Sequence, residues 1–152
     1  MDLASKRATT YSALFLRMAL GISFLSAVAD RFGLWGPYGR PNVAWGDFAR
    51  FVAYTEKLNW FVPASMVAVL AWASTFAEAL LGLALVVGFF TRAAALLSGL
   101  LLLWFALTMT VALGVKAALD LSVFSASAGA FSLAAYGKYA LSIDELRKAA
   151  RV

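Results

Sequence analysis

The 152-residue sequence contains no cysteine and no histidine, and it has only three prolines. The lack of Cys and His excludes disulfides, thiol redox chemistry, structural zinc sites and haem held by either side chain. It also removes the general base that enzymes use most often near neutral pH. We therefore expect no metal or haem ligated by this chain, so that electron chemistry needs an organic cofactor such as a quinone, or another subunit.

Charged residues are also scarce, at 14% of the chain, whereas hydrophobic residues make up 63%. Soluble domains average about 25% charged and about 45–50% apolar residues. A soluble fold of this size leaves roughly 30% of its unfolded surface in water, which is too much for this composition. The composition excludes an ordinary soluble domain, a disordered chain and a nucleic-acid module. It predicts an all-helical integral membrane protein.

Long uncharged runs locate the membrane spans, at residues 58–77, 93–115 and 121–137. A span needs about 20 mostly apolar residues. Another apolar stretch follows the N-terminus, and we interpret it as a genuine span because Arg17 interrupts it where a signal peptide would be uncharged. The second span is longer than its uncharged run and includes Glu78. The sequence therefore predicts a single transmembrane domain over 1–152. It is a four-helix bundle with spans at about 11–29, 63–90, 93–114 and 119–141.

The longest break between predicted spans covers residues 30–62 and begins with several glycines and prolines, which disfavour regular structure. The apolar spacing after Asp47 predicts a short amphipathic helix with that residue as its N-cap. The segment also contains Trp35 and Trp45, and such aromatic residues favour the membrane interface. Two interpretations stay open: an interfacial helix that rests on lipid, which we favour, and an aromatic lid over a site between the helices.

Two ionisable residues, Arg17 and Glu78, lie inside predicted spans. A charge in lipid is costly, so such residues usually face the bundle interior and have a partner. Counted at 1.5 Å per residue from Asp30 and Pro63, both lie roughly 20 Å from one membrane face. We therefore predict an Arg17–Glu78 pair. One interpretation is a structural ion pair. The other is the candidate catalytic site, a polar spot for a quinone carbonyl, a proton or an anion, with Glu78 as proton shuttle, and the two are not exclusive.

Other charged residues lie at the predicted outer ends of the helices. Asp30 and Arg31 close the first span, and Lys116 and Asp120 flank the turn before the fourth. They form either ordinary charged helix ends or a charged rim around a shallow pocket, and Asp120 is also the predicted N-cap of the fourth helix. The candidate binding residues are therefore Trp35, Trp45, Asp30, Arg31, Lys116 and Asp120.

The distribution of lysine and arginine predicts the orientation in the membrane. Four spans place both termini on one side, and that side holds seven basic residues against five on the other. We therefore expect both termini in the cytoplasm. The seven are Lys6, Arg7, Arg92, Lys138, Arg147, Lys148 and Arg151.

Three stretches, residues 15–33, 78–96 and 136–146, together resemble the DoxX family of small bacterial membrane proteins. Each motif is loose, but their order and spacing make the set fairly specific. The residues that carry the resemblance are Arg17, Gly21 and Arg31 in the first stretch, Glu78, Gly82, Gly88, Thr91 and Arg92 in the second, and Gly137, Tyr139, Ser142 and Asp144 in the third.

The resemblance implies a four-helix bundle in the bacterial inner membrane and a link to respiratory or sulfur redox chemistry. Some relatives are subunits of a terminal quinol oxidase or of a thiosulfate:quinone oxidoreductase. The aromatic loop with Trp35 and Trp45 looks like a feature of a subgroup, to which that sulfur chemistry need not transfer.

Our leading hypothesis is a quinone-contacting subunit of a membrane oxidoreductase. One alternative is a non-catalytic scaffold or assembly subunit of a membrane complex. Another is a small anion-binding or transport module that uses Arg17, Arg31 and Lys116. The expected partners are the lipid bilayer, membrane redox subunits and a second copy in a homodimer, but no nucleic acid.

Overall fold

The computed structural model describes residues 3–150, and within that range the chain forms helices and no strand, as predicted. Three helices are long and apolar enough to cross a membrane, α1, α3 and α4, and α6 is a shorter apolar helix. The elements are α1 (Leu3–Arg31), α2 (Phe48–Leu58), α3 (Ala64–Val87), α4 (Thr91–Leu113), α5 (Val115–Asp120), α6 (Val123–Tyr136) and α7 (Ile143–Ala149).

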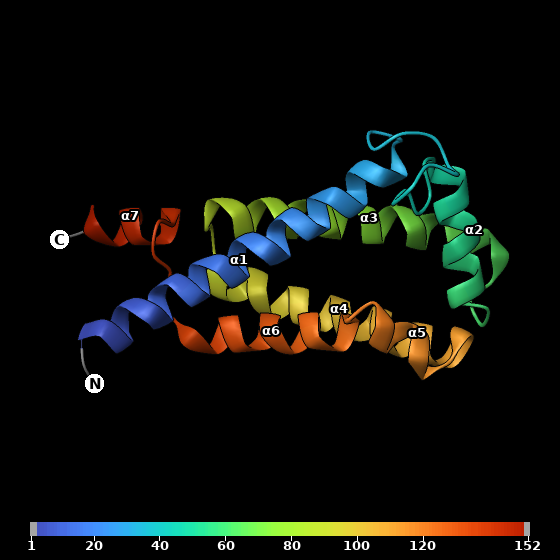
Figure 1. Ribbon diagram of the computed structural model, residues 1–152. Helices are drawn as coiled ribbons and strands as arrows, with labels where there is room; N and C mark the ends of the chain where they lie inside the picture. The colour runs from blue at the N-terminus through green and yellow to red at the C-terminus, as the bar shows by residue number, and fades with distance from the viewer. Residues whose placement is uncertain (1–2, 151–152) are drawn as a thin grey trace.

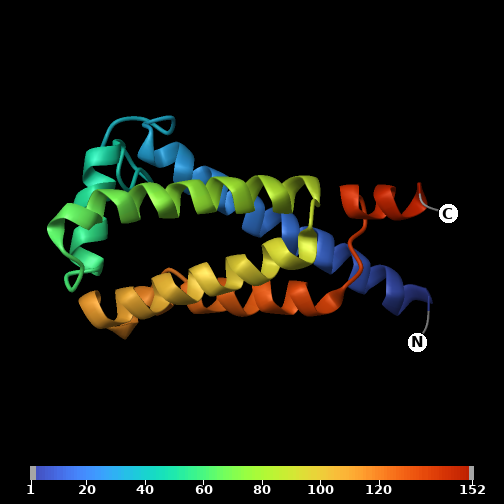
Figure 2. The same cartoon turned by 180° about the vertical axis from the view of Figure 1, so that it is seen from behind.

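The helices form two layers, with α1 packed on α3 and α4 packed on α6. The layers diverge from the α3–α4 turn, and α2 lies across the far end, where it contacts both α3 and α4 (Figures 1 and 2). The start of α1 and helix α7 both lie at the other end, which we call the terminal end (Figure 1). This arrangement leaves the space between the layers closed at one end by α2.

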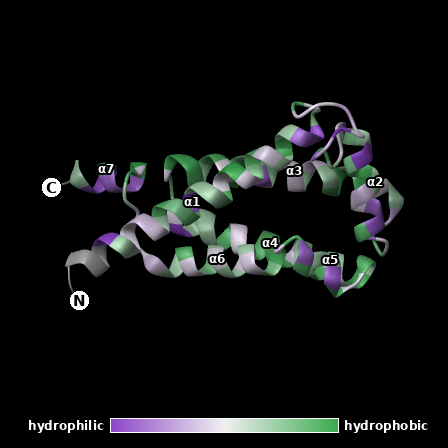
Figure 3. Ribbon diagram, in the orientation of Figure 1, coloured by the Kyte–Doolittle hydropathy of each residue, from purple (hydrophilic) through white to green (hydrophobic). Residues whose placement is uncertain are grey.

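The surface of the long helices is apolar. Figure 3 shows hydrophobic residues along α3 and α4, whereas hydrophilic residues gather at α2, α5 and α7. Large apolar side chains project outward, among them Phe15, Phe76, Leu80 and Val111, each at least 60% exposed. A helix that is apolar on its outer face as well as its inner face is typical of a membrane span. The chain is therefore a membrane protein.

The fourth predicted span, 119–141, differs from the structure because the chain breaks inside it. Gly114 and Ser122 have positive φ angles of 89° and 53°, which separate α5 from α4 and α6 from α5. The N-cap of α6 is Ser122, whereas Asp120 is the last residue of α5, so the predicted capping role of Asp120 is wrong. The 14 residues of α6 extend about 21 Å, less than the roughly 30 Å of a hydrocarbon core.

The predicted amphipathic helix is α2. Its N-cap is Asp47, whose side chain accepts a hydrogen bond of 2.9 Å from the backbone N of Arg50. Its buried residues are Phe51, Thr55 and Leu58, which recur every three or four positions and so form one face. That face points into the bundle.

Two glycines set the close crossing of α1 and α3. A Cβ atom added to Gly21 would lie 2.9 Å from the carbonyl oxygen of Gly82, and one added to Gly82 would lie 3.0 Å from that of Gly21. Small residues allow helix backbones in a membrane to approach this closely. The crossing fixes how far the end of α1 reaches along α3.

Candidate functional site

A cavity of about 830 Å³ lies between the two helix layers and is lined in part by the buried face of α2. This volume is in the range of small-molecule sites, about 300–1,000 Å³. Most of the lining is aliphatic or aromatic and comes from α1, α3, α4 and α6. The buried polar side chains among the lining residues are Arg31, Thr55, Asn59, Ser74, Glu78, and Thr108.

A buried ion pair forms the charged part of this lining. Nη2 of Arg31, at the end of α1, lies 2.6 Å from Oε1 of Glu78 in α3, and each side chain is only 3% exposed. Nη1 of Arg31 donates to Oγ1 of Thr75 at 2.9 Å. Such a charged pair is held in an apolar site only when hydrogen bonds support it.

Aromatic rings cover the Arg31 guanidinium. Its carbon atom lies 3.7 Å from the ring centroid of Phe51 and 5.4 Å from that of Trp45. Cation–π contacts of this kind contribute about 2 kcal/mol when the cation is desolvated. The two rings bring the loop before α2 and α2 itself against the ion pair.

Two buried polar atoms of residues that line the cavity lack a hydrogen-bond partner among the described residues, namely Nε of Arg31 and Oδ1 of Asn59. The amide nitrogen of Asn59 donates instead to the carbonyl of Thr55 at 2.9 Å. An unpaired buried polar group costs about 1–3 kcal/mol. The cavity lining therefore has one unused donor, at the ion pair, and one unused acceptor, at the end of α2.

The predicted pairing of Arg17 with Glu78 is wrong, because Glu78 pairs with Arg31. The depth estimate assumed that the outer ends of the first two spans are level. Instead Arg31 meets Thr75 and Glu78, which lie about three and four turns into α3. The C-terminal end of α1 therefore lies beside the middle of α3 and is not level with the N-terminal end of α3.

Arg17 has a different role. Its Nη1 and Nη2 atoms donate to the carbonyls of Ala140 and Leu141 at 3.2 and 2.8 Å. It lies beside Gly88, at the end of α3 far from α2, and it is not among the residues that line the cavity. Arg17 therefore holds the segment that follows α6.

The aromatic loop is anchored through Asp30. Its Oδ2 atom accepts hydrogen bonds from the backbone N of Ala44 and of Trp45, at 2.9 and 3.1 Å. This places Trp45 among the residues that line the cavity. Trp35 does not line it, since its indole N donates to the carbonyl of Ser26 and its side chain is 59% exposed.

The predicted charged rim does not form. Lys116 and Asp120 pair with each other on the exposed surface of α5, and neither lines the cavity. Arg17, Arg31 and Lys116, the cations of the alternative anion-binding module, do not form one site, because they lie beside the C-terminal segment, in the cavity and on α5, respectively. Of the six predicted binding residues, Arg31 and Trp45 line the cavity, and Asp30 supports Trp45.

The sequence interpretation missed Thr75, Phe51 and Asn59. Thr75 precedes Glu78 by three residues, so the two share one face of α3, and this spacing was a usable signal. Phe51 follows Asp47 by four residues on the apolar face of the predicted amphipathic helix. The position of Asn59 had no comparable signal, because it depends on how α2 ends.

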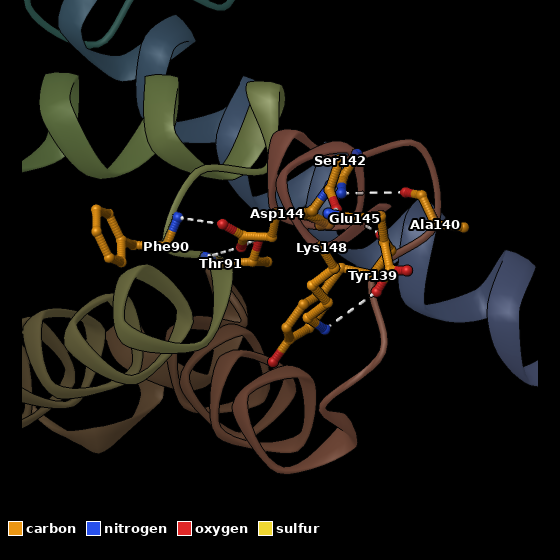
Figure 4. Close-up of polar contacts among 9 residues, drawn as sticks. Phe90, Thr91, Tyr139, Ala140, Ser142, Asp144, Glu145 and Lys148 are labelled. Atoms are coloured by element: carbon orange, nitrogen blue, oxygen red, sulfur yellow. Dashed lines mark hydrogen bonds and ion pairs between the residues drawn. The ribbon is translucent and has the colours of Figure 1, made fainter. Parts of the chain in front are cut away.

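A second group of contacts holds the C-terminal segment onto the α3–α4 turn (Figure 4). The carboxylate of Asp144 accepts hydrogen bonds from the backbone N of Phe90 at 3.0 Å, and from the backbone N and the hydroxyl of Thr91 at 2.7 and 2.8 Å. Its own backbone N donates to the carbonyl of Gly88 at 3.0 Å. The N-cap residue of α4, Phe90, has no side-chain cap of its own, so Asp144 caps this helix from the far end of the chain.

Replacing Asp144 with alanine should lower the free energy of unfolding by about 1–2 kcal/mol, as for the loss of an N-cap. Trypsin should then cut faster after Lys138, because the segment that follows is released. Glu56→Ala is a control that removes the same charge from the exposed side of α2, at the other end of the molecule. Equal proteolysis rates for the two variants would contradict the capping role.

The same contacts make this stabilisation depend on pH. Burial alone raises the pKa of the Asp144 carboxyl, but the hydrogen bonds from Thr91 and Phe90 and the nearby Lys148 outweigh it and hold the pKa below its usual value. The carboxylate therefore stabilises the fold above the unfolded-state pKa, about 3.9, and this contribution disappears as the pH falls through the folded-state pKa. The difference in stability between the wild type and Asp144→Ala should be constant from pH 7 to about 5 and shrink below about pH 4.

Apolar spans around a cavity with a buried ion pair define a helical membrane protein with an internal site. The DoxX family model matches residues 12–113, about two thirds of the chain, and so covers the cavity's ion pair. The chain belongs to the DoxX family. Neither the curated proteins nor the solved structures gave a match.

Proposed function

We propose that the protein is a quinone-contacting subunit of a membrane oxidoreductase system. The observation that carries this proposal is the 830 Å³ cavity, mainly apolar, with the Arg31–Glu78 pair among its lining. An isoprenoid quinone has one polar ring and a long apolar chain. The ring fits beside Arg31 and Glu78, and the chain fits the apolar remainder between the layers.

The polar atoms of the cavity suit both redox forms of such a ring. Nε of Arg31 is a donor without a partner, and it suits a quinone carbonyl. Oδ1 of Asn59 is an acceptor without a partner, and it suits a hydroxyl of the reduced form. Glu78 is the one carboxyl group among the lining residues, so we assign it the proton relay. Electrons would come from another subunit, as this chain offers no Cys or His to hold a metal centre.

We also place the protein in the bacterial inner membrane with both termini in the cytoplasm. The terminal end has exposed Arg92, Lys138, Arg147 and Lys148. With Arg7, the described part of that end has five exposed basic residues. The other end has four, namely Arg40, Arg50, Lys57 and Lys116, because Arg31 is buried in its ion pair. The positive-inside rule then favours this orientation. Arg151 lies outside the described residues.

Blocking the cavity tests the proposal. Ala73 and Ala68 are both exposed on α3, but only Ala73 lines the cavity. We expect the detergent-purified wild type and Ala68→Trp to bind a short-chain ubiquinone analogue equally, and Ala73→Trp to bind it at least about tenfold more weakly, a loss of about 1.4 kcal/mol. Equilibrium dialysis with the analogue measures all three proteins.

Glu78→Gln separates binding from proton transfer, because it keeps the size of the side chain and removes its ionisation.

Loss of binding in Ala68→Trp as well as Ala73→Trp would contradict the cavity as the site. If the wild type binds no quinone but purifies with a stoichiometric cofactor-containing partner, the scaffold function replaces this proposal.

A further inference from the structure

A second cavity, of about 630 Å³, lies at the terminal end of the molecule. It is formed by the first turns of α4, by residues 137 and 139 after α6, and by α7. None of its lining residues lines the larger cavity. It is therefore separate from the proposed quinone site.

Three cations line this second cavity, namely Arg92, Arg147 and Lys148, against one acid, Asp144. Both carboxylate oxygens of Asp144 are already occupied by Phe90 and Thr91. Nζ of Lys148 lies 3.3 Å from Oε1 of Glu145, whereas Arg92 and Arg147 form no ion pair within residues 3–150. The cavity therefore carries excess positive charge with two cations unneutralised.

The cations converge on one place. Arg147 lies over the rings of Phe89 and Phe90, at 5.6 and 5.7 Å from their centroids. Arg92 and Lys148 both lie close enough to the hydroxyl of the buried Tyr139 to lower its pKa, although burial raises it more. An anion in the cavity would thus contact cations from α4 and from α7 together.

The remaining lining is apolar and continues onto the membrane-facing side of α4. Ala93 and Leu96 are exposed on that helix, and Leu96 is 47% exposed. Phe90, beside them, is 59% exposed at the end of the span. A soluble anion would use the cations and leave this apolar surface bare, whereas a phospholipid would use both. Basic pockets at the ends of membrane helices bind anionic head groups in this way.

We propose that this second cavity binds one anionic phospholipid. Its phosphate lies between Arg92, Arg147 and Lys148, and its acyl chains follow Ala93 and Leu96 along α4. Since the head group then joins α4 to α7, the bound lipid holds the C-terminal segment against the α3–α4 turn.

Lipid exchange into the detergent-purified protein, followed by native mass spectrometry, tests this assignment. We expect one phosphatidylglycerol per chain, and much weaker binding of phosphatidylcholine. The triple variant Arg92→Gln, Arg147→Gln, Lys148→Gln should bind phosphatidylglycerol on the order of 100-fold more weakly, because each basic residue near an anionic lipid is worth about a factor of five.

The matched control, Arg40→Gln, Lys57→Gln, Lys116→Gln, removes the same charge elsewhere, and it should bind phosphatidylglycerol within about threefold of the wild type. Equal losses in the two triple variants would overturn the proposal, as would equal binding of the two lipids. The comparison of lipids on the wild type needs no variant, so it decides the question even if the first triple variant does not fold. Inorganic phosphate that displaces phosphatidylglycerol at the lipid's own concentration would assign the site to a free anion.

Discussion

Replacing Glu78 with leucine should lower the free energy of unfolding by about 3–5 kcal/mol, because it leaves the buried guanidinium of Arg31 without its counter-charge. Arg31 is 2% exposed and keeps only Thr75 and the rings of Phe51 and Trp45 as partners in that variant. Arg31→Met should cost a similar amount, since it leaves Glu78 unpaired. Unfolding titrations in mixed micelles measure both variants.

The double variant Arg31→Met, Glu78→Leu should recover most of the lost stability, because two apolar side chains replace a desolvated pair. The matched control uses the other buried arginine. Arg17 donates hydrogen bonds to the carbonyls of Ala140 and Leu141. The losses in unfolding free energy caused by Arg17→Met and by Glu78→Leu should therefore add to within about 0.5 kcal/mol in the double variant. A large coupling energy between Arg17 and Glu78, with none between Arg31 and Glu78, would contradict the ion pair assigned here.

Local signals in the sequence predicted the elements well. The predicted spans 63–90 and 93–114 match α3 and α4 to within three residues at each end. The apolar spacing after Asp47 predicted α2 and its cap, because both depend on residues within two turns of each other. The break before α6 was missed, since a positive φ at Ser122 is rare for a residue with a side chain.

The partner of Glu78 could not be found by counting residues from helix ends. That count treats the outer ends of α1 and α3 as level, whereas the aromatic loop folds back over α1 and is anchored on Asp30. Arg31 was assigned to a surface rim because it closes a helix, yet it is one of the most buried polar residues. The ion pair depends on the offset between two helices, which is a property of their packing and not of either sequence segment alone.

The role of Asp144 illustrates the same limit. The sequence places it in a loose closing motif, and nothing local links it to residues more than fifty positions earlier. In the structure it caps α4, while Arg17 holds the backbone just before it. Two of the residues that carry the family resemblance, Arg17 and Asp144, thus stabilise the packing of the C-terminal segment. Two others, Arg31 and Glu78, form the ion pair in the cavity.

The offset that brings Arg31 to Glu78 depends on the crossing at Gly21, which gives a further expected result. Gly21→Ala should lower the free energy of unfolding by up to about 2 kcal/mol. An added methyl group would lie 2.9 Å from the backbone oxygen of Gly82 and 2.8 Å from Cγ2 of Val86, so α1 and α3 must separate. The cost of such overpacking is typically 1–3 kcal/mol, and at this site it exceeds the gain of about 1 kcal/mol from replacing a helical glycine.

Gly129→Ala in α6 is the matched control, because its added methyl group would meet only the flexible end of Leu16, at 3.2 Å. This variant should be as stable as the wild type or up to about 1 kcal/mol more stable. The coupling energy between Arg31 and Glu78, measured again in each background, then tests whether the crossing positions the pair. It should fall in Gly21→Ala and persist in Gly129→Ala, because only the first moves the end of α1 along α3. An unchanged coupling energy in Gly21→Ala would mean that the aromatic loop and Asp30, not the helix crossing, hold Arg31 against Glu78.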